Sequence, residues 1–250
     1  MNIEALLQAD DMLWIAHRGA KSECPENTLP AFIRAVEMGA DMIELDVRLA
    51  GDGSLVILHD PTLNRTTNGK GAVSDMTLAQ IRQYDAGAWF DLRFQGTLVP
   101  TLDEVLAALP NTCLNIELKT DSTARAQALV RRVLGCIYRH GAAGRVLLSS
   151  FDHAALADVR ALDPTIALGA LFVGRPWPPF DLAETLRLSS LHPDVEHLDP
   201  HFVAQAKGQG YAVFAWTVRS KEDLSHCVQA GVSGVILDDL TYQHAASSPI

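Results

Sequence analysis

Three short apolar stretches of this sequence end in residues that could do chemistry. Alternate residues of a β-strand share one face, so each stretch would carry polar side chains opposite apolar ones. A polar face of this kind either meets water or points into a site. The residues are His17 and Arg18 in IAHRG, Glu44 and Asp46 in IELDV, and Asn115, Glu117 and Lys119 in NIELK.

The three carboxylates, Glu44, Asp46 and Glu117, would repel one another in a confined space. Each is also unfavourable to desolvate unless it is paired or bound to a metal. A divalent metal ion or elevated pKa values would relieve the repulsion. Oxygen ligands with no nearby cysteine suit Mg²⁺ or Ca²⁺ rather than zinc. Lys119 and Arg18 offset part of the negative charge and offer donors for a phosphate.

The elements that must position these residues alternate between strands and helices, which indicates a parallel sheet with helices outside. Apolar runs that favour strands begin near residues 13, 42, 113, 145, 166, 190, 211 and 234. Amphipathic stretches with cap signals predict helices at 28–39, 101–110, 122–141, 152–164, 199–210 and 220–231. Eight strands close a (β/α)₈ barrel, whose enzymes place their sites at the carboxyl ends of the strands. The charged faces would then point into the lumen.

One further apolar run, LVILH at 55–59, breaks this rhythm because only RLAGDGS separates it from the strand at 42–47. A parallel crossover needs a dozen or more residues, so this run should be antiparallel. Asp52-Gly53 is typical of a two-residue hairpin turn. That turn would place Asp46 opposite His59, whereas a slip of one residue would put them on opposite faces.

The chain is expected to form a single TIM-barrel domain over residues 1–250. Residues 61–100 fit no strand–helix unit and are predicted to be an insertion subdomain over the barrel mouth, after strand 2 and its hairpin. The tail at 242–250 is expected to be a frayed end.

The net charge of −10 argues against nucleic acid or an anionic membrane as an electrostatic partner, although it leaves room for a small phosphorylated ligand.

Neither a signal peptide nor the roughly 20 apolar residues of a membrane span is found. The cysteines are scattered without a CxxC pair, which fits a reducing cytosol. We therefore expect a cytoplasmic protein. Its oligomeric state is not readable from the sequence. The cysteines are Cys24, Cys113, Cys136 and Cys227.

Each motif alone has a simpler explanation. E-x-D in a strand is usually a solvated face, a histidine before Asp-Pro is most often a turn residue, and E-x-K is most often at the surface. Together they favour a site, because four chemically suitable strand ends fall in one predicted barrel.

The ordered motifs AHRGA…PENTLPAF, IELDVRL, LVILHDPTLNRTT, NIELK, SSF, FAWTV and GVILD, over about residues 14–239, resemble the glycerophosphodiester phosphodiesterase family. The resemblance implies a distorted (β/α)₈ TIM barrel with a small insertion after the H-D motif. It also implies two catalytic histidines, a set of divalent-metal ligands, phosphate contacts and aromatic residues beside the glycerol or alcohol. The implied catalytic histidines are His17 and His59, and the implied metal ligands are Glu44, Asp46 and Glu117. Arg18 and Lys119 would contact the phosphate, and Phe151 and Trp216 would lie beside the glycerol or alcohol.

Smaller features of the resemblance concern the surroundings of the site. Asn27 and Thr28 of PENT are expected to cap the first helix, and Glu26 is a candidate to assist the site. LDDL keeps Asp238 but lacks the Thr and Pro common in the family. His192, in SLHP, would face the pocket if a strand ends there.

The implied activity is metal-dependent hydrolysis of a glycerophosphodiester, a small molecule, to sn-glycerol 3-phosphate and an alcohol. One histidine would take a proton from the nucleophile, water or the substrate's 2-hydroxyl, and the other would give one to the leaving alkoxide. We expect His17 to be the base and His59 the acid.

Two alternatives remain open. A phospholipase-type barrel enzyme acting on lipid phosphodiesters should expose apolar loops at the barrel mouth, and AGAWFDLRF at 86–94 offers some apolar surface. A non-catalytic ligand-binding barrel would usually have lost a metal ligand or a catalytic base, and none is missing from the motifs.

Overall fold

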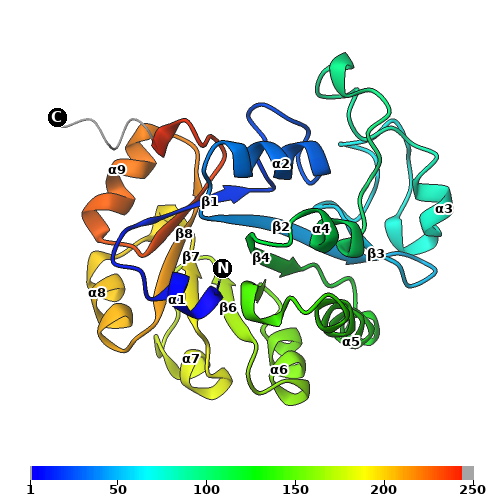
Figure 1. Ribbon diagram of the computed structural model, residues 1–250. Helices are drawn as coiled ribbons and strands as arrows, with labels where there is room; N and C mark the ends of the chain where they lie inside the picture. The colour runs from blue at the N-terminus through cyan, green and yellow to red at the C-terminus, as the bar shows by residue number, and fades with distance from the viewer. Residues whose placement is uncertain (1, 244–250) are drawn as a thin grey trace.

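The centre of the molecule is a closed barrel of parallel strands, seen in a computed structural model that describes residues 2–243 (Figure 1). The strand β1 pairs with both β2 and β9, which closes the ring. The barrel strands are β1 (Leu13–His17), β2 (Met42–Leu49), β4 (Cys113–Leu118), β5 (Val146–Ser150), β6 (Ala167–Phe172), β7 (Ser190–Pro193), β8 (Ala212–Val218) and β9 (Gly234–Leu237). All the predicted barrel strands are confirmed, and the fold is a TIM barrel. Residues 244–250 of the tail lie outside the described residues.

Helices surround the strands (Figure 1). The helices predicted from the sequence are confirmed as α2 (Leu29–Glu37), α4 (Leu102–Ala108), α5 (Thr123–Arg139), α6 (His153–Leu162), α8 (Pro200–Gly208) and α9 (Lys221–Ala230). Three helices were not predicted: α1 (Ile3–Leu7), α3 (Leu78–Ile81) and α7 (Asp181–Leu186). They are too short to repeat the helical pattern of apolar residues. Single 3₁₀ turns are η1 (Val73–Asp75), η2 (Leu92–Phe94), η3 (Ala143–Arg145) and η4 (Val195–His197).

The helix starts follow from capping side chains. Thr28 accepts a hydrogen bond from Ala31 N at the start of α2. Thr101 and Ser220 form reciprocal capping boxes at the starts of α4 and α9. These caps satisfy backbone N–H groups that have no partner inside the helix.

The core leaves only one end of the barrel polar. At the amino ends of the strands, Ile3 of α1 packs with Leu13, Met42 and Phe214, so apolar side chains fill the barrel there. A larger apolar layer lies between the strands and the helices. The polar side chains of the strands are therefore gathered toward the carboxyl ends.

The hairpin is antiparallel as predicted, but its register is one residue away from the prediction. In β3 (Leu55–Ile57), Val56 faces Arg48, so His59 does not lie opposite Asp46. The backbone N–H of Ala50 bonds to Ser54 O, which makes a three-residue loop. Gly53 adopts φ +85° there, as the last residue of such loops often does. The prediction of a two-residue turn at Asp52-Gly53 is therefore wrong.

The shifted register does not remove His59 from the barrel mouth. The strand β3 ends at Ile57, Leu58 N donates to Asp46 O at 3.0 Å, and the chain then bends. His59 lines the same cavity as Glu117. The bend after the strand, and not the pairing in it, places this histidine.

The segment 61–100 contains η1, α3 and η2 and lies beside β3, in cyan and blue-green in Figure 1. Its apolar residues Leu63, Ile81 and Val99 pack with Val56 and Leu58 of the hairpin in a small core of their own. The division into one barrel domain and an insertion subdomain over the mouth stays a prediction. Among residues 2–243, we find no helix with the length and apolar character needed to cross a membrane.

Candidate active site

A cavity of about 270 Å³ opens at the carboxyl ends of the barrel strands and gathers the predicted site residues. Only Asp46 of that set is absent from its lining, and it bonds to two lining residues, Arg18 and Lys119. A larger hollow of about 390 Å³ beside Trp177 and Phe202 lacks the buried carboxylates of this cavity. The smaller cavity is therefore the candidate active site.

Strand pairing brings the three carboxylates together. Asp46 of β2 is in register with Glu117 of β4, and Glu44 of β2 is in register with His17 of β1. Oxygens of Glu44, Asp46 and Glu117 lie within 4.8 Å of one another, and all three side chains are buried.

The charges at this cluster are unevenly compensated. Burial and repulsion from its neighbours raise the pKa of Glu44 well above its usual value. Burial and the charge of Asp46 raise the pKa of Glu117 to about 7. Burial also disfavours the charged form of Asp46, but Lys119 and Arg18 outweigh it and lower the pKa of Asp46. Burial and repulsion therefore outweigh the nearby positive charges at Glu44 and Glu117, but not at Asp46.

This donor set fits a hard divalent cation. The ligand atoms of Glu44, Asp46 and Glu117 are all oxygens, as Mg²⁺ and Ca²⁺ prefer. A cation there would neutralise the repulsion that raises the pKa of Glu44 and Glu117.

Two of the basic residues that line the cavity, Lys119 and Arg18, form ion pairs with the clustered carboxylates. The Nζ of Lys119 lies 2.6 Å from Glu117 Oε1 and 3.2 Å from Asp46 Oδ1. The Nε of Arg18 lies 3.3 Å from Asp46 Oδ2, and its Nη1 donates to Glu26 Oε1 at 2.8 Å. Lys119 and Arg18 line the cavity, where they can also reach a phosphate.

The turn after β1 explains the H-R-G motif. Arg18 is left-handed, with φ 59°, and its backbone N–H donates to Glu44 Oε2 at 3.0 Å. Gly19 follows with φ +84°, and a Cβ there would lie 2.7 Å from the backbone of Ala31. Only glycine fits this close approach to α2 without strain.

The expectation that Asn27 helps to cap α2 is wrong, because its side chain bonds to Asp46, a candidate metal ligand. Thr28 caps α2 as expected, but Asn27 donates from Nδ2 to Asp46 Oδ2 at 2.7 Å. Its Oδ1 accepts from Asp46 N at 3.2 Å. Asn27 has φ 56°, a left-handed conformation that asparagine tolerates better than most residues. The P-E-N-T motif therefore orients Asp46.

His17 is held by an aspartate from the far end of the chain. Asp238 Oδ1 lies 2.5 Å from His17 Nδ1, and Nε2 of the same ring lies 4.0 Å from Glu44 Oε2. Because a carboxylate only accepts hydrogen bonds, Nδ1 carries a proton. Burial lowers the pKa of His17 to about 4, although Asp238 opposes this shift. The neutral ring then presents a lone pair at Nε2.

His59, which lines the same cavity, also has a carboxylate at its Nδ1. Its Nδ1 lies 2.7 Å from Asp60 Oδ1, and Arg65 bonds to both oxygens of Asp60 at 2.9 Å. Burial lowers the pKa of His59, against the charge of Asp46, which raises it. The cavity thus contains two histidines, each backed by a carboxylate at Nδ1.

An aromatic wall closes one side of the cavity. The rings of Phe151 and Trp216 meet edge to face at 5.1 Å, and both residues line the cavity. Trp216 Nε1 donates to His192 O at 2.7 Å, which fixes the indole. Lys119 Nζ lies 5.9 Å from the centre of the Phe151 ring.

Comparison with known proteins agrees with this geometry. A model of the glycerophosphoryl diester phosphodiesterase family matches residues 17–241. The chain belongs to the glycerophosphoryl diester phosphodiesterase family. It is 41% identical over 229 residues to the glycerophosphodiester phosphodiesterase of Caldanaerobacter subterraneus subsp. tengcongensis, over 91% of this chain and 94% of the relative. It is 31% identical to a glycerophosphodiester phosphodiesterase of Bacillus subtilis, over 92% of this chain and 84% of the relative.

A solved structure is also similar. An Oleispira antarctica phosphodiesterase, in complex with the product sn-glycerol-3-phosphate, has a TM-score of 0.89 to this chain. The two chains are 32% identical, and the match covers 94% of this chain and 97% of the other. Fold and sequence therefore agree on the family.

The cavity of this member of the glycerophosphoryl diester phosphodiesterase family also contains two polar residues that are not among the predicted site residues. Asn115 Nδ2 and Oδ1 and Ser149 Oγ are buried without a hydrogen-bond partner among the residues described. Both side chains line the cavity. Asn115 shares the strand face of Glu117, a signal visible in the sequence, whereas Ser149 has only its strand-end position as a signal.

His192 is buried on β7, but it does not line the cavity. Its Nε2 lies 2.8 Å from Ser190 Oγ, and its ring packs against Phe214 at 5.2 Å. Burial lowers the pKa of His192 to about 3, so the ring is neutral. Its position in the barrel interior favours a core role.

Proposed function

We propose that this chain hydrolyses glycerophosphodiesters to sn-glycerol 3-phosphate and an alcohol with the help of a divalent cation, Mg²⁺ or Ca²⁺, in the cytoplasm. The observation that carries the proposal is one cavity that joins three buried carboxylates to two histidines, each with a carboxylate at Nδ1. A relative of the same fold is known in complex with sn-glycerol-3-phosphate, which supports a small glycerol phosphate as a ligand.

Glu44, Asp46 and Glu117 would hold the cation. When bound, the cation would act as a Lewis acid on a phosphate oxygen. Arg18 and Lys119 line the same cavity, and we assign their N–H groups to the phosphate oxygens that gain charge during the reaction. Asn27 keeps Asp46 oriented while Arg18 shifts from carboxylate to phosphate.

The two histidines move the protons. His17 Nε2 takes a proton from the nucleophile, water or the substrate's 2-hydroxyl, while Asp238 stabilises the ring through Nδ1. His59 gives a proton to the leaving alkoxide, and Asp60 holds its ring. We assign the acid to His59 because its side chain is 33% exposed against 12% for His17, so a leaving alcohol can depart past it.

We further assign the glycerol hydroxyls to Asn115 and Ser149. These buried groups have unused donors and acceptors in the cavity, and leaving them unpaired would be unfavourable. A hydroxyl both donates and accepts, so it matches an amide and a serine. Phe151 and Trp216 then flank the apolar edges of the glycerol or the alcohol.

A second candidate, action on lipid phosphodiesters, is favoured by one observation. Apolar side chains are exposed on segments that follow the carboxyl ends of strands, namely Trp89 and Leu92 of the insertion and Trp177 after β6. Trp177 is 90% exposed. Sedimentation with zwitterionic vesicles tests this candidate: binding that is lost in Trp177→Ala supports it.

The main proposal is tested by coupled detection of glycerol 3-phosphate from a panel of glycerophosphodiesters. We expect release with Mg²⁺ or Ca²⁺ present and none with a chelator. No release from any member of the panel, with either ion, would overturn the proposal.

A further inference from the structure

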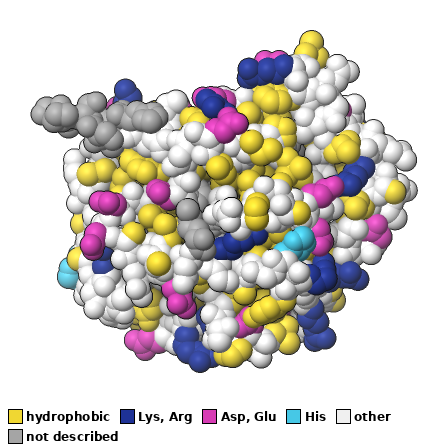
Figure 2. All heavy atoms as spheres, in the orientation of Figure 1, with side chains coloured by type: hydrophobic (Ala, Val, Ile, Leu, Met, Phe, Trp, Pro, Cys, Tyr) yellow, Lys and Arg dark blue, Asp and Glu magenta, His cyan; other side chains and the backbone are white. Residues whose placement is uncertain are grey.

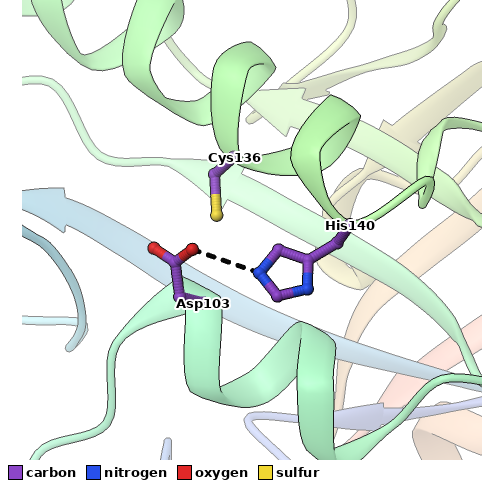
Figure 3. A group of neighbouring side chains, drawn as sticks. All are labelled: Asp103, Cys136 and His140. Atoms are coloured by element: carbon purple, nitrogen blue, oxygen red, sulfur yellow. Dashed lines mark hydrogen bonds and ion pairs between the residues drawn. The ribbon is translucent and has the colours of Figure 1, made fainter.

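A second group of metal-binding residue types lies away from the cavity, between α4 and α5. Asp103 offers a carboxylate from the first turn of α4, and Cys136 and His140 offer a thiol and an imidazole from the end of α5. Figure 3 shows the three side chains pointing toward one another. Their ligand atoms lie within 4.8 Å of one another. We call these residues the α4–α5 cluster.

The spacing of the cluster comes directly from helix geometry. Cys136 and His140 are four positions apart, so they stand one above the other on the same face of α5. Asp103 faces them from the neighbouring helix, and its Oδ1 lies 3.1 Å from His140 Nε2. Two helices thus offer sulfur, nitrogen and oxygen to one point.

Two protons converge on one carboxylate in this cluster. The His140 ring hydrogen-bonds to Asp103, and the Cys136 thiol lies within 4.8 Å of the same carboxylate. Burial, with the charge of Asp103, raises the pKa of the Cys136 thiol to about 12, so the sulfur carries its proton. A cation that binds at this point must replace these two protons.

We propose that the α4–α5 cluster binds a zinc-class divalent cation through Asp103 Oδ1, Cys136 Sγ and His140 Nε2, with water as the fourth ligand. Mixed sulfur, nitrogen and oxygen donors suit zinc and not Mg²⁺ or Ca²⁺. Binding releases the thiol proton to solvent, and the ring proton moves to Nδ1, so no oxidant or reductant is needed. The proposal is independent of the function assigned to the barrel cavity.

Positive charge near the α4–α5 cluster, from Arg139, means that a cation can bind there only if its ligands carry negative charge. Arg139 Nη2 lies 3.1 Å and 3.4 Å from the two oxygens of Asp103. Figure 2 shows Lys and Arg side chains gathered at the lower right, where α5 lies in Figure 1. Arg139 is 63% exposed and can turn into solvent. A thiolate and a carboxylate would then balance the charge of a divalent ion.

The consequence of binding would be a link between two helices of the shell. The helix α4 directly follows the insertion, and Thr101 before it bridges to Val56 of β3. Fixing α4 to α5 would therefore stabilise the support of the insertion and leave the barrel cavity unchanged. An ion that binds only the folded chain raises its melting temperature.

Titration of the full reduced chain with Co²⁺, a spectroscopic substitute for Zn²⁺, tests the proposal. A cobalt–thiolate bond gives a charge-transfer band in the near ultraviolet, whereas the all-oxygen site of the barrel gives none. We expect the band to saturate by two equivalents, because the barrel carboxylates can also take up Co²⁺, to be displaced by Zn²⁺, and to be lost in Cys136→Ser. It should persist in Cys227→Ser, a matched change at another buried cysteine, and in Glu44→Gln.

The controls separate folding from binding. Circular dichroism checks that Cys136→Ser is folded, and Asp103→Asn and His140→Ala should each weaken Co²⁺ binding at least tenfold. Zn²⁺ should raise the melting temperature of the wild type by more than that of Cys136→Ser, in which only the barrel carboxylates remain intact. The proposal is overturned if the wild type gives no thiolate band, or if Cys136→Ser keeps it.

Discussion

Asp238 at the end of β9 and His17 at the end of β1 form a 2.5 Å contact between Oδ1 and Nδ1, although 221 positions separate them in the chain. The contact exists because β1 and β9 are paired where the barrel closes. It fixes the proton of His17 at Nδ1 and turns Nε2 toward Glu44. Asp238 is therefore the positioning residue of the proposed base.

Asp238→Asn should lower kcat by about 10²–10⁴-fold, the usual range for general acid–base catalysis, with a smaller effect on KM. The amide keeps the shape but can donate to Nδ1, which favours the wrong tautomer of His17. Steady-state kinetics on a glycerophosphodiester measure the effect. Asp239→Asn is the matched control, because that carboxylate bonds to Thr241 at the surface. Equal rates for both variants would show that Asp238 does not position His17 for catalysis.

His59→Ala should show that this residue is the general acid. With an alcohol leaving group, kcat should fall by about 10²–10⁴-fold, because the alkoxide needs a proton. With p-nitrophenolate, which leaves without a proton, the fall should be much smaller. His17→Ala should lose activity on both substrates. Full activity of His59→Ala on a glycerophosphodiester is the result that ends the two-histidine mechanism.

Asn115→Ala and Ser149→Ala should separate glycerol recognition from chemistry. Each variant should lose roughly 10-fold in kcat/KM on glycerophosphodiesters, equivalent to about one hydrogen bond. Activity on bis(p-nitrophenyl) phosphate, which has no glycerol, should be unchanged. The exposed Asn111 offers the matched control Asn111→Ala. An equal loss on both substrates would contradict the assignment of these residues to glycerol.

Glu26 should link stability to pH. It bonds to Arg65 and Arg18 at 2.8 Å, and these contacts outweigh burial and lower its pKa from 4.5 to about 2. A lowered folded pKa means that the stabilisation is fully present above pH 4.5 and is lost as the pH falls toward 2. Glu26→Gln should therefore lower the free energy of unfolding by about 1–3 kcal/mol at pH 7.

Urea unfolding of Glu26→Gln and wild type at pH 7 and pH 3 measures this difference, which should shrink at the lower pH. The control Glu37→Gln removes an exposed ion pair with Arg34 and should change stability by less than about 1 kcal/mol. A difference that grows toward acid pH would show that Glu26 is not held ionised by its arginines.

Much of the barrel could be predicted because each strand is a local apolar run and each polar face repeats every second residue. Glu44, Asp46 and Glu117 were predicted in this way to converge, and their oxygens lie within 4.8 Å of one another. The contact of Asp238 with His17 could not be found, because it depends on how distant strands meet at the barrel closure. The hairpin register failed at Gly53, since one Asp-Gly pair can serve loops of two or three residues.

The role of Asn27 was missed for a related reason. An asparagine before Thr28 reads as part of a helix cap, and only the packing of that turn against β2 brings it to Asp46. Local sequence patterns thus gave the residue types at the site, whereas the supporting contacts required the three-dimensional structure.

Catalysis should depend on a cation held by Glu44, Asp46 and Glu117. The experiment removes all metal with a chelator, adds back Mg²⁺ or Ca²⁺, and measures glycerol 3-phosphate release by wild type and Glu117→Gln. We predict that chelation abolishes wild-type activity, that one of the two ions restores it, and that Glu117→Gln stays at least 10²-fold less active at saturating metal. Unchanged activity of the wild type after chelation would show that catalysis needs no bound cation.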